Sequence, residues 1–208
     1  MKRLTAMIGA FAMIGFAFTS GALTPLVGSA QERVPPFERL TRPRITLPDD
    51  HQGAISHRHM CPESNDTCRT YRAYAGYFVR NATIPPRDRE LLILRTAWLS
   101  RGDYIWGRHN VMGQDAGLTE VEIRRVTEGP DAAGWSNFDT ALLTAADELH
   151  TSRFVSNVTW NTLAQRYSES QQREVVLIVG NYTQLSMFHN ALGAQLEPGV
   201  AGLPDEEQ

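Results

Sequence analysis

Apolar residues recur at helical spacing through most of the chain after Thr67. One clear stripe is formed by Tyr71, Tyr74, Ala75 and Phe78, which stand at positions i, i+3, i+4 and i+7 and so share one face of an α-helix. In the second half of the chain, no segment alternates apolar and polar residues with the period of two that marks a half-buried strand. The pattern therefore predicts an all-α domain.

Helix-breaking and helix-capping residues divide this region into six to seven helices. Pro85 and Pro86 end one helix and begin the next, and Gly117 suits a left-handed position at a helix end. Thr119 and Glu122 form a capping box for a short helix. The last helix is apolar on most sides, which predicts that neighbouring helices or other subunits bury it. The helices expected after the first stripe cover residues 87–100, 103–116, 119–127, 137–151, 156–167 and 169–192.

The N-terminus has the order of a secretory signal peptide. Lys2 and Arg3 precede an apolar stretch over residues 4–23, and the small residues 28–30 (Gly-Ser-Ala) follow it. The alternative is an uncleaved anchor, because the apolar stretch approaches the length that spans a bilayer. Small residues dominate the stretch and interrupt its end, so we expect cleavage after Ala30 and a secreted or periplasmic protein.

The mature chain is long enough for one domain with a sizeable core. Removal of the first 30 of 208 residues leaves 178. Residues 31–66 are rich in Pro, Arg, Asp and His and show no helical or strand period, which indicates an extended arm. We expect the helical domain over residues 67–198 and a C-terminal tail over residues 199–208.

Charge and lysine content exclude several functions. The formal net charge of −3 becomes −5 when Lys2 and Arg3 are removed, and the mature part has no basic block. These features argue against a nucleic-acid partner. Lys2 is the only lysine of the chain, so Schiff-base chemistry and a lysine general base are excluded from the mature domain. No later segment is apolar enough to span a membrane, so we expect no membrane contact after cleavage.

Cys61 and Cys68 are the two cysteines, and both lie in the mature part. In an oxidising compartment, such a close pair indicates a local disulfide more than a metal or redox site. The histidines of the arm, His51, His57 and His59, are a weak metal signal, and surface solvation explains them better. We therefore expect no metal site.

The densest group of polar and aromatic residues lies where two predicted helices meet. Glu90 is near the start of one helix, and Asp103, Tyr104, Trp106 and His109 follow in the first two turns of the next. A histidine beside a carboxylate is the minimal unit for proton transfer, because the carboxylate orients the ring and stabilises its charged form. The alternative is that His109 is a core histidine bonded to the backbone and that the aromatic residues only pack.

Six stretches follow one another in the order of a known family. They are 87–95 (RDRELLILR), 103–109 (DYIWGRH), 116–119 (AGLT), 134–136 (GWS), 145–150 (AADELH) and 180–193. These stretches resemble the carboxymuconolactone decarboxylase family, and the likeness runs from Arg87 to Pro198. The resemblance implies an all-α, alkylhydroperoxidase D-like fold that assembles as trimers or hexamers with sites near subunit contacts. It also implies one of two activities, a cofactor-free decarboxylase or a thiol-dependent hydroperoxidase.

The chain departs from both motifs of this family. The redox branch carries a Glu followed by C-x-x-C-x-x-x-H, and the cysteine positions are here Gly102 and Ile105. Glu90 and His109 are retained, but a peroxidase of this type needs the thiolate. Relatives without cysteines carry a motif that resembles Glu-Tyr-Glu-Trp-x-x-His. In this chain Asp103 stands at the position of the first Glu and Ile105 at that of the second. Ile105 makes the pocket more apolar, which we expect to raise the pKa of a remaining buried carboxyl.

The leading hypothesis is a cofactor-independent enzyme of the carboxymuconolactone decarboxylase type. His109, assisted by Glu90, would transfer a proton to or from an activated carbon of a small carbonyl, lactone or acid. Asp103 would orient or polarise the substrate, and Tyr104 and Trp106 would shape the pocket. The expected partners are the small-molecule substrate and further copies of the chain.

Two more residues are candidates for the pocket, and two other functions remain open. Arg95 is either a clamp for a substrate carboxylate or, as we favour, a buried structural ion pair. His189 either approaches the same pocket or faces a subunit contact. The second hypothesis is a non-catalytic helical oligomer that binds a ligand or partner, which Ile105 supports. The third is a thiol antioxidant that uses Cys61 and Cys68.

Overall fold

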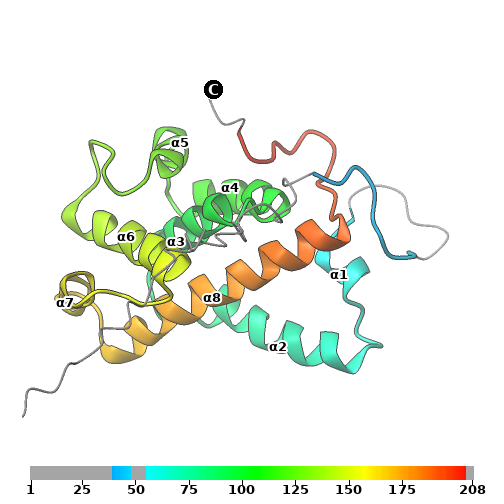
Figure 1. The fold of residues 1–208 in the computed structure, drawn as a ribbon, viewed down its shortest axis with the longest axis horizontal. Helices are drawn as coiled ribbons and strands as arrows, with labels where there is room; N and C mark the ends of the chain where they lie inside the picture. Colours follow the sequence, from blue (N-terminus) through cyan, green and yellow to red (C-terminus); the bar gives the residue numbers. More distant parts are fainter. Residues whose placement is uncertain (1–38, 48–54, 205–208) are drawn as a thin grey trace, which may run out of the picture. The chain divides into compact units, whose positions relative to one another are not determined.

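The computed structural model describes residues 39–47 and 55–204. Within these residues the secondary structure is helical, apart from one isolated antiparallel bridge between Ile55 and Gln195. The predicted all-α fold is confirmed. In chain order the helices are α1 (His57–Met60), α2 (Asp66–Arg80), α3 (Pro86–Leu99), α4 (Asp103–Asp115), α5 (Glu120–Glu128), α6 (Asn137–Ser152), α7 (Asn157–Ala164) and α8 (Glu169–Leu192) (Figure 1).

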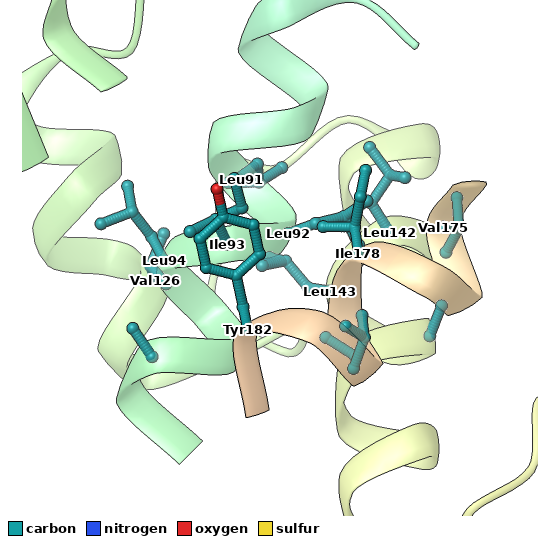
Figure 2. Packing of buried hydrophobic residues seen from close by; sticks show 14 of the residues in the cluster. Leu91, Leu92, Ile93, Leu94, Val126, Leu142, Leu143, Val175, Ile178 and Tyr182 are labelled. Carbon is teal, nitrogen blue, oxygen red and sulfur yellow. The ribbon is translucent and has the colours of Figure 1, made fainter. Parts of the chain in front are cut away.

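Helix α3 is the centre of the fold and contacts α4, α5, α6 and α8. Its residues Leu91–Leu94 are completely buried, although they are consecutive and therefore point in four directions around the helix. A helix that is apolar all round is stable only when other elements cover every side. Figure 2 shows this arrangement, with Leu142 and Leu143 of α6 and Tyr182 of α8 packed around α3.

The long helix α8 divides into a buried and an exposed face. Val175, Ile178 and Tyr182 belong to the core, whereas Leu177 is 44% and Met187 64% exposed. The sequence predicts a helix buried on most sides by neighbours or other subunits. In the single chain the apolar residues of its outer face stay uncovered.

Capping residues set the helix ends largely as predicted. The capping box of Thr119 and Glu122 is present, with the Glu122 backbone N–H donating to the Thr119 hydroxyl at 3.2 Å. Gly193 ends α8 in the left-handed conformation with φ 77°. Helix α7 is shorter than expected and ends at Ala164, because turns replace its last residues before Tyr167.

The predicted extended arm is only partly extended. Residues 55–66 hold the one-turn helix α1, which sequence periodicity misses because it is too short to show a period. The backbone N–H of Ser56 donates to His59 Nδ1 at 3.1 Å and stabilises this turn. Residues 39–47 lie beside the end of α8, where the Arg44 N–H donates to the Leu192 carbonyl at 3.0 Å.

The ends of the chain are partly outside the described residues. The predicted signal peptide over residues 1–30 lies outside them, as do residues 205–208 of the predicted tail. Residues 199–204 are described and lie against α4, where the Leu203 N–H donates to Asp103 Oδ1 at 2.9 Å. None of the helices in the described part is long and apolar enough to cross a membrane.

Candidate active site

Glu90 and His109 form a buried pair between α3 and α4. His109 Nδ1 lies 2.6 Å from Glu90 Oε2, and the Glu90 side chain is completely buried. The other carboxylate oxygen accepts a hydrogen bond from Arg89 Nε at 3.0 Å. Among the described residues, the His109 ring makes no further hydrogen bond to the protein. Its second nitrogen, Nε2, is therefore the one available for proton transfer.

The electrostatics of the pair favour an ionised glutamate. Burial alone would raise the pKa of Glu90, but the hydrogen bond and charge of His109 and the neighbouring Arg89 outweigh it, and the net pKa is lowered. The expectation of a raised pKa is therefore wrong for Glu90, because His109 and, to a smaller extent, Arg89 stabilise the ionised carboxylate. An ionised Glu90 keeps the proton of His109 on Nδ1 and stabilises the charged ring.

A cavity of about 950 Å³ lies beside this pair and opens to solvent. His109, Tyr104 and Ile105 of α4 line it together with Tyr182 and His189 of α8. The Tyr182 ring packs edge-on against the His109 ring with centroids 4.9 Å apart. The structure thus brings together four of the predicted residues, with Glu90 directly behind His109 and with Tyr104 and His189 in the same wall.

The cavity wall carries more positive than negative side chains. Glu63 is paired with Arg72 at 3.0 Å, and Glu197 with Arg108 at 2.7 Å. These two are the glutamates of the wall, whereas five of its residues are arginines. Arg69 is also paired, with Asp66 at 2.7 Å, which leaves Arg58 and Arg80 without an ion pair among the described residues. These two arginines favour an anionic ligand, since arginine binds carboxylates through paired hydrogen bonds. The arginines are Arg58, Arg69, Arg72, Arg80 and Arg108.

Asp103 and Trp106 do not reach this cavity. Asp103 accepts hydrogen bonds from Leu203 and pairs with Arg39 at 3.1 Å, so it holds the C-terminal segment. The Trp106 ring packs near Trp98 with centroids 6.0 Å apart. Successive helical residues are about 100° apart around the axis, which places both residues on the side of α4 opposite its cavity face. Their predicted roles at the substrate are corrected by this geometry.

Arg95 is a structural residue and is not part of the cavity wall. Its guanidinium binds both carboxylate oxygens of Asp147, at 2.6 and 2.8 Å, and donates to the carbonyls of Val126 at 2.7 Å and Thr127 at 3.1 Å. These bonds join α3, the end of α5 and α6. They use four of the five N–H groups of the guanidinium and support the interpretation as an ion pair, and Arg95 does not line the cavity.

The two positions of the missing redox cysteines are occupied in different ways. A Cβ atom at Gly102 would overlap the Ser186 hydroxyl, which donates to the Tyr182 carbonyl at 2.8 Å. Ile105 lines the cavity beside His109. The site therefore has neither a thiol nor the space for one at position 102 without a shift of α8.

Cys61 and Cys68 form the predicted disulfide, with an S–S distance of 2.05 Å. They line a second, mostly apolar hollow together with Tyr71, Tyr74 and Phe188. Neither cysteine lines the cavity that contains His109. The third hypothesis, a thiol antioxidant that uses Cys61 and Cys68, would therefore have to act at this disulfide, away from the cavity that contains His109.

Sequence reasoning missed His57 and all five of the cavity arginines. His57 Nδ1 lies 3.3 Å from His189 Nε2 in the cavity wall. The residue belongs to the short helix α1, and neither spacing nor charge marked it as different from the other histidines of the arm. Among the residues that the structure describes, no group of three or more His, Cys, Asp or Glu could hold a metal ion.

A buried central helix surrounded by α-helices gives the chain an AhpD-like fold. The sequence pattern of the carboxymuconolactone decarboxylase family matches residues 62–148, and this match supports a place in that family. This family match begins 25 residues before Arg87, where the resemblance in the sequence begins, and it ends before helix α8. No curated protein sequence matches the chain.

Similar solved structures support the same fold. A protein of unknown function from Agrobacterium tumefaciens, for which a role as an antioxidant defence protein AhpD has been suggested, is 16% identical; 69% of this chain and 97% of that chain are covered, with a TM-score of 0.59. A peroxidase-related protein from Ralstonia eutropha JMP134 is 14% identical, with 64% and 72% covered and a TM-score of 0.57. The debrominase Bmp8 is 15% identical, with 68% and 76% covered and a TM-score of 0.58.

Proposed function

We propose that this protein is a cofactor-independent enzyme that transfers a proton to or from carbon in a small carboxylate substrate with a ketone or lactone group. Its place in the family supports an enzyme or a peroxidase-like function. The observation that favours proton transfer is the 2.6 Å contact between His109 and the buried Glu90, beside a cavity rich in arginine. Decarboxylation, lyase and isomerase reactions all fit this site.

In a decarboxylation, each group would have a defined task. The bond between the substrate carbon and its leaving carboxylate breaks, carbon dioxide departs, and the bonding electrons move into the neighbouring carbonyl to give an enolate. Protonated His109 delivers its Nε2 proton to the enolate carbon and regains one from water. Glu90 stabilises the charged ring through Nδ1, and the cavity arginines hold a second, non-reacting carboxylate.

A non-catalytic ligand-binding protein is the second candidate. Ile105 stands where an acid is found in relatives without cysteines, and Asp103 is used to hold the C-terminal segment. The site thus lacks two carboxylates that could assist catalysis. Such a protein would bind anionic ligands in the same cavity without turnover.

We also propose that the protein is exported and self-associates. The order of charged, apolar and small residues at the N-terminus supports export, and so does the Cys61–Cys68 disulfide, since disulfides persist in oxidising compartments. The exposed apolar residues of α2 and α8 support contact between copies. They are Tyr74, Tyr77, Val79, Val176, Leu177 and Met187.

The test of the proposed function is a substrate screen with the variant His109→Gln. The unmodified protein is incubated with small keto acids and lactone acids, and carbon dioxide release and proton exchange at carbon are measured. We expect turnover that His109→Gln lowers by at least about 100-fold, the usual contribution of a general acid–base. The matched control is His150→Gln, which changes a half-buried histidine of α6 outside the cavity wall. Equal turnover by His109→Gln and the unmodified protein would contradict the assignment, and binding without any turnover would favour the second candidate.

A further inference from the structure

Besides His109, the cavity wall contains two histidines that contact each other. His57 of α1 and His189 near the end of α8 have ring centroids 5.3 Å apart and nearly perpendicular rings, with Nδ1 of the first 3.3 Å from Nε2 of the second. Both residues line the cavity. Both also lie outside residues 62–148, the part that matches the family pattern, so this pair is not implied by the family match.

The outer nitrogens of the pair have no hydrogen-bond partner. His57 Nε2 and His189 Nδ1 are both buried, and among the described residues neither atom contacts a donor or acceptor. A neutral imidazole has one donor and one acceptor nitrogen. When one ring donates to the other, the two outer nitrogens are therefore always one N–H donor and one acceptor. Buried polar atoms without a partner are rare, and a bound group is one explanation for them.

The surroundings keep both rings uncharged. Burial and, to a smaller extent, the positive charge of Arg72 on α2 together lower the pKa of His57 to about 4. Burial lowers the pKa of His189 to about 3, with smaller contributions from His57 and from His109 on α4. The Tyr104 ring of α4 packs on His189 with centroids 4.7 Å apart. A neutral pair enclosed in this way is suited to an uncharged oxygen, while the arginines of the wall are suited to a carboxylate.

We infer that His57 and His189 form a subsite that hydrogen-bonds the uncharged ketone or lactone oxygen of the substrate whose carboxylate binds to the cavity arginines. This inference rests on the proposed function and assigns the recognition of the ketone or lactone oxygen to these two histidines. Two separate anchors, one neutral and one anionic, would fix the orientation of the carbon skeleton between them. That carbon skeleton would then lie beside His109 Nε2, since His109 and His189 line the same wall.

The test compares the binding of two probes that differ only in the carbonyl oxygen. The first probe is γ-carboxy-γ-butyrolactone, and the second is tetrahydrofuran-α-carboxylate, the same ring without the carbonyl. Dissociation constants are measured by titration calorimetry with the unmodified protein, with His57→Phe and with the control His150→Phe. We expect the unmodified protein and the control to bind the lactone about tenfold more tightly, the size expected for one hydrogen bond. We expect His57→Phe to bind both probes equally, with the affinity for the second probe unchanged.

Two results would overturn the inference. One is an equal affinity of the unmodified protein for the two probes, including no binding of either. The other is a lactone preference that His57→Phe retains. Nitrogen NMR of the histidine rings in the unmodified protein tests the same point without a substitution. The signals of His57 and His189 should shift with the lactone and stay in place with the second probe, and the reverse result would contradict the assignment.

Failure of this inference and failure of the proposed function give different results. The binding experiment needs no turnover, so a protein without catalytic activity can still show the expected preference for the lactone. That result would support the His57–His189 subsite and contradict the assignment of the protein as an enzyme. Turnover that depends on His109 together with an unchanged lactone preference in His57→Phe gives the opposite conclusion. The thermal midpoint of each variant is compared with that of the unmodified protein, so that a folding defect is recognised.

Discussion

His109 Nδ1 and Glu90 Oε2 are 2.6 Å apart, although the two residues are separated by 19 positions and lie on different helices. The contact exists because α3 and α4 pack against each other, which brings the second turn of one helix beside the middle of the other. Arg89 binds the second oxygen of the same carboxylate. The glutamate therefore acts on the histidine from a fixed position, and the cavity side of the ring remains open to a ligand.

Replacing Glu90 by Gln should separate its role in catalysis from its role in folding. The amide keeps the shape but loses the charge that stabilises protonated His109, so we expect turnover to fall by about 100-fold, within the range for general acid–base catalysis. The free energy of unfolding should fall by about 1–3 kcal/mol, because Arg89 loses a charged partner. Steady-state kinetics and urea unfolding measure the two effects. Glu169→Gln, an exposed change in α8, is the control, and equal turnover in both variants would refute the role of Glu90.

The variant Arg95→Met should affect stability and leave ligand binding unchanged. It removes the charged partner of Asp147 and the donors to two backbone carbonyls. Breaking such a pair on one side lowers the free energy of unfolding by about 3 kcal/mol. Urea unfolding measures this change, with Arg173→Met as a control in an exposed ion pair that contributes about 0.5 kcal/mol or less. A lost affinity for carboxylate ligands in folded Arg95→Met would instead support the clamp role.

A methyl group at position 102 should destabilise the contact between α4 and α8. Gly102→Ala places its Cβ on the Ser186 hydroxyl, and we expect the free energy of unfolding to fall by about 1–3 kcal/mol. The additional change Ser186→Ala should restore part of the loss, which a double-mutant cycle measures. Gly180→Ala is the control, since nothing lies near its Cβ and alanine favours the helix by up to about 1 kcal/mol. An additive result would mean that the two positions do not interact.

The protein should lose stability as the pH falls from about 6.5 to about 4. The pKa of His57 is about 4 and that of His189 about 3 in the folded chain, each lowered from 6.5. In this window the unfolded chain binds more protons than the folded one, so acid favours unfolding. Urea unfolding at several pH values measures the slope. It should be smaller in His57→Phe than in the unmodified protein, and identical slopes in these two proteins would rule out a contribution of His57.

The helices and the Glu90–His109 pair could be predicted from the sequence because local patterns and the order of motifs along the chain indicate them. The stripe from Tyr71 to Phe78 and the Thr119 cap are local features, and the structure has both a helix and a capping box there. Glu90 and His109 stood out because the chain retains them in the order of a known motif. Such features need no knowledge of which helices are neighbours.

The other site residues depend on contacts between distant segments, which the sequence does not reveal. Asp103 and Trp106 share a helix with His109, but the face of α4 that meets the cavity is set by the position of α8. His57 lies in the wall because the segment before α2 returns to the end of α8, where Ile55 pairs with Gln195. A helical period says nothing about such a return, so this histidine could not be distinguished from its neighbours in the sequence.

The segment that carries His57 is tied to the helical bundle on both sides. Before α1, Ile55 and Gln195 exchange two backbone hydrogen bonds at 3.0 and 3.2 Å. After α1, the bond from Cys61 to Cys68 ties this one-turn helix to the first turn of α2. If the chain is exported as proposed, the covalent tie would form in an oxidising compartment and add to the hydrogen bonds that already hold the cavity wall.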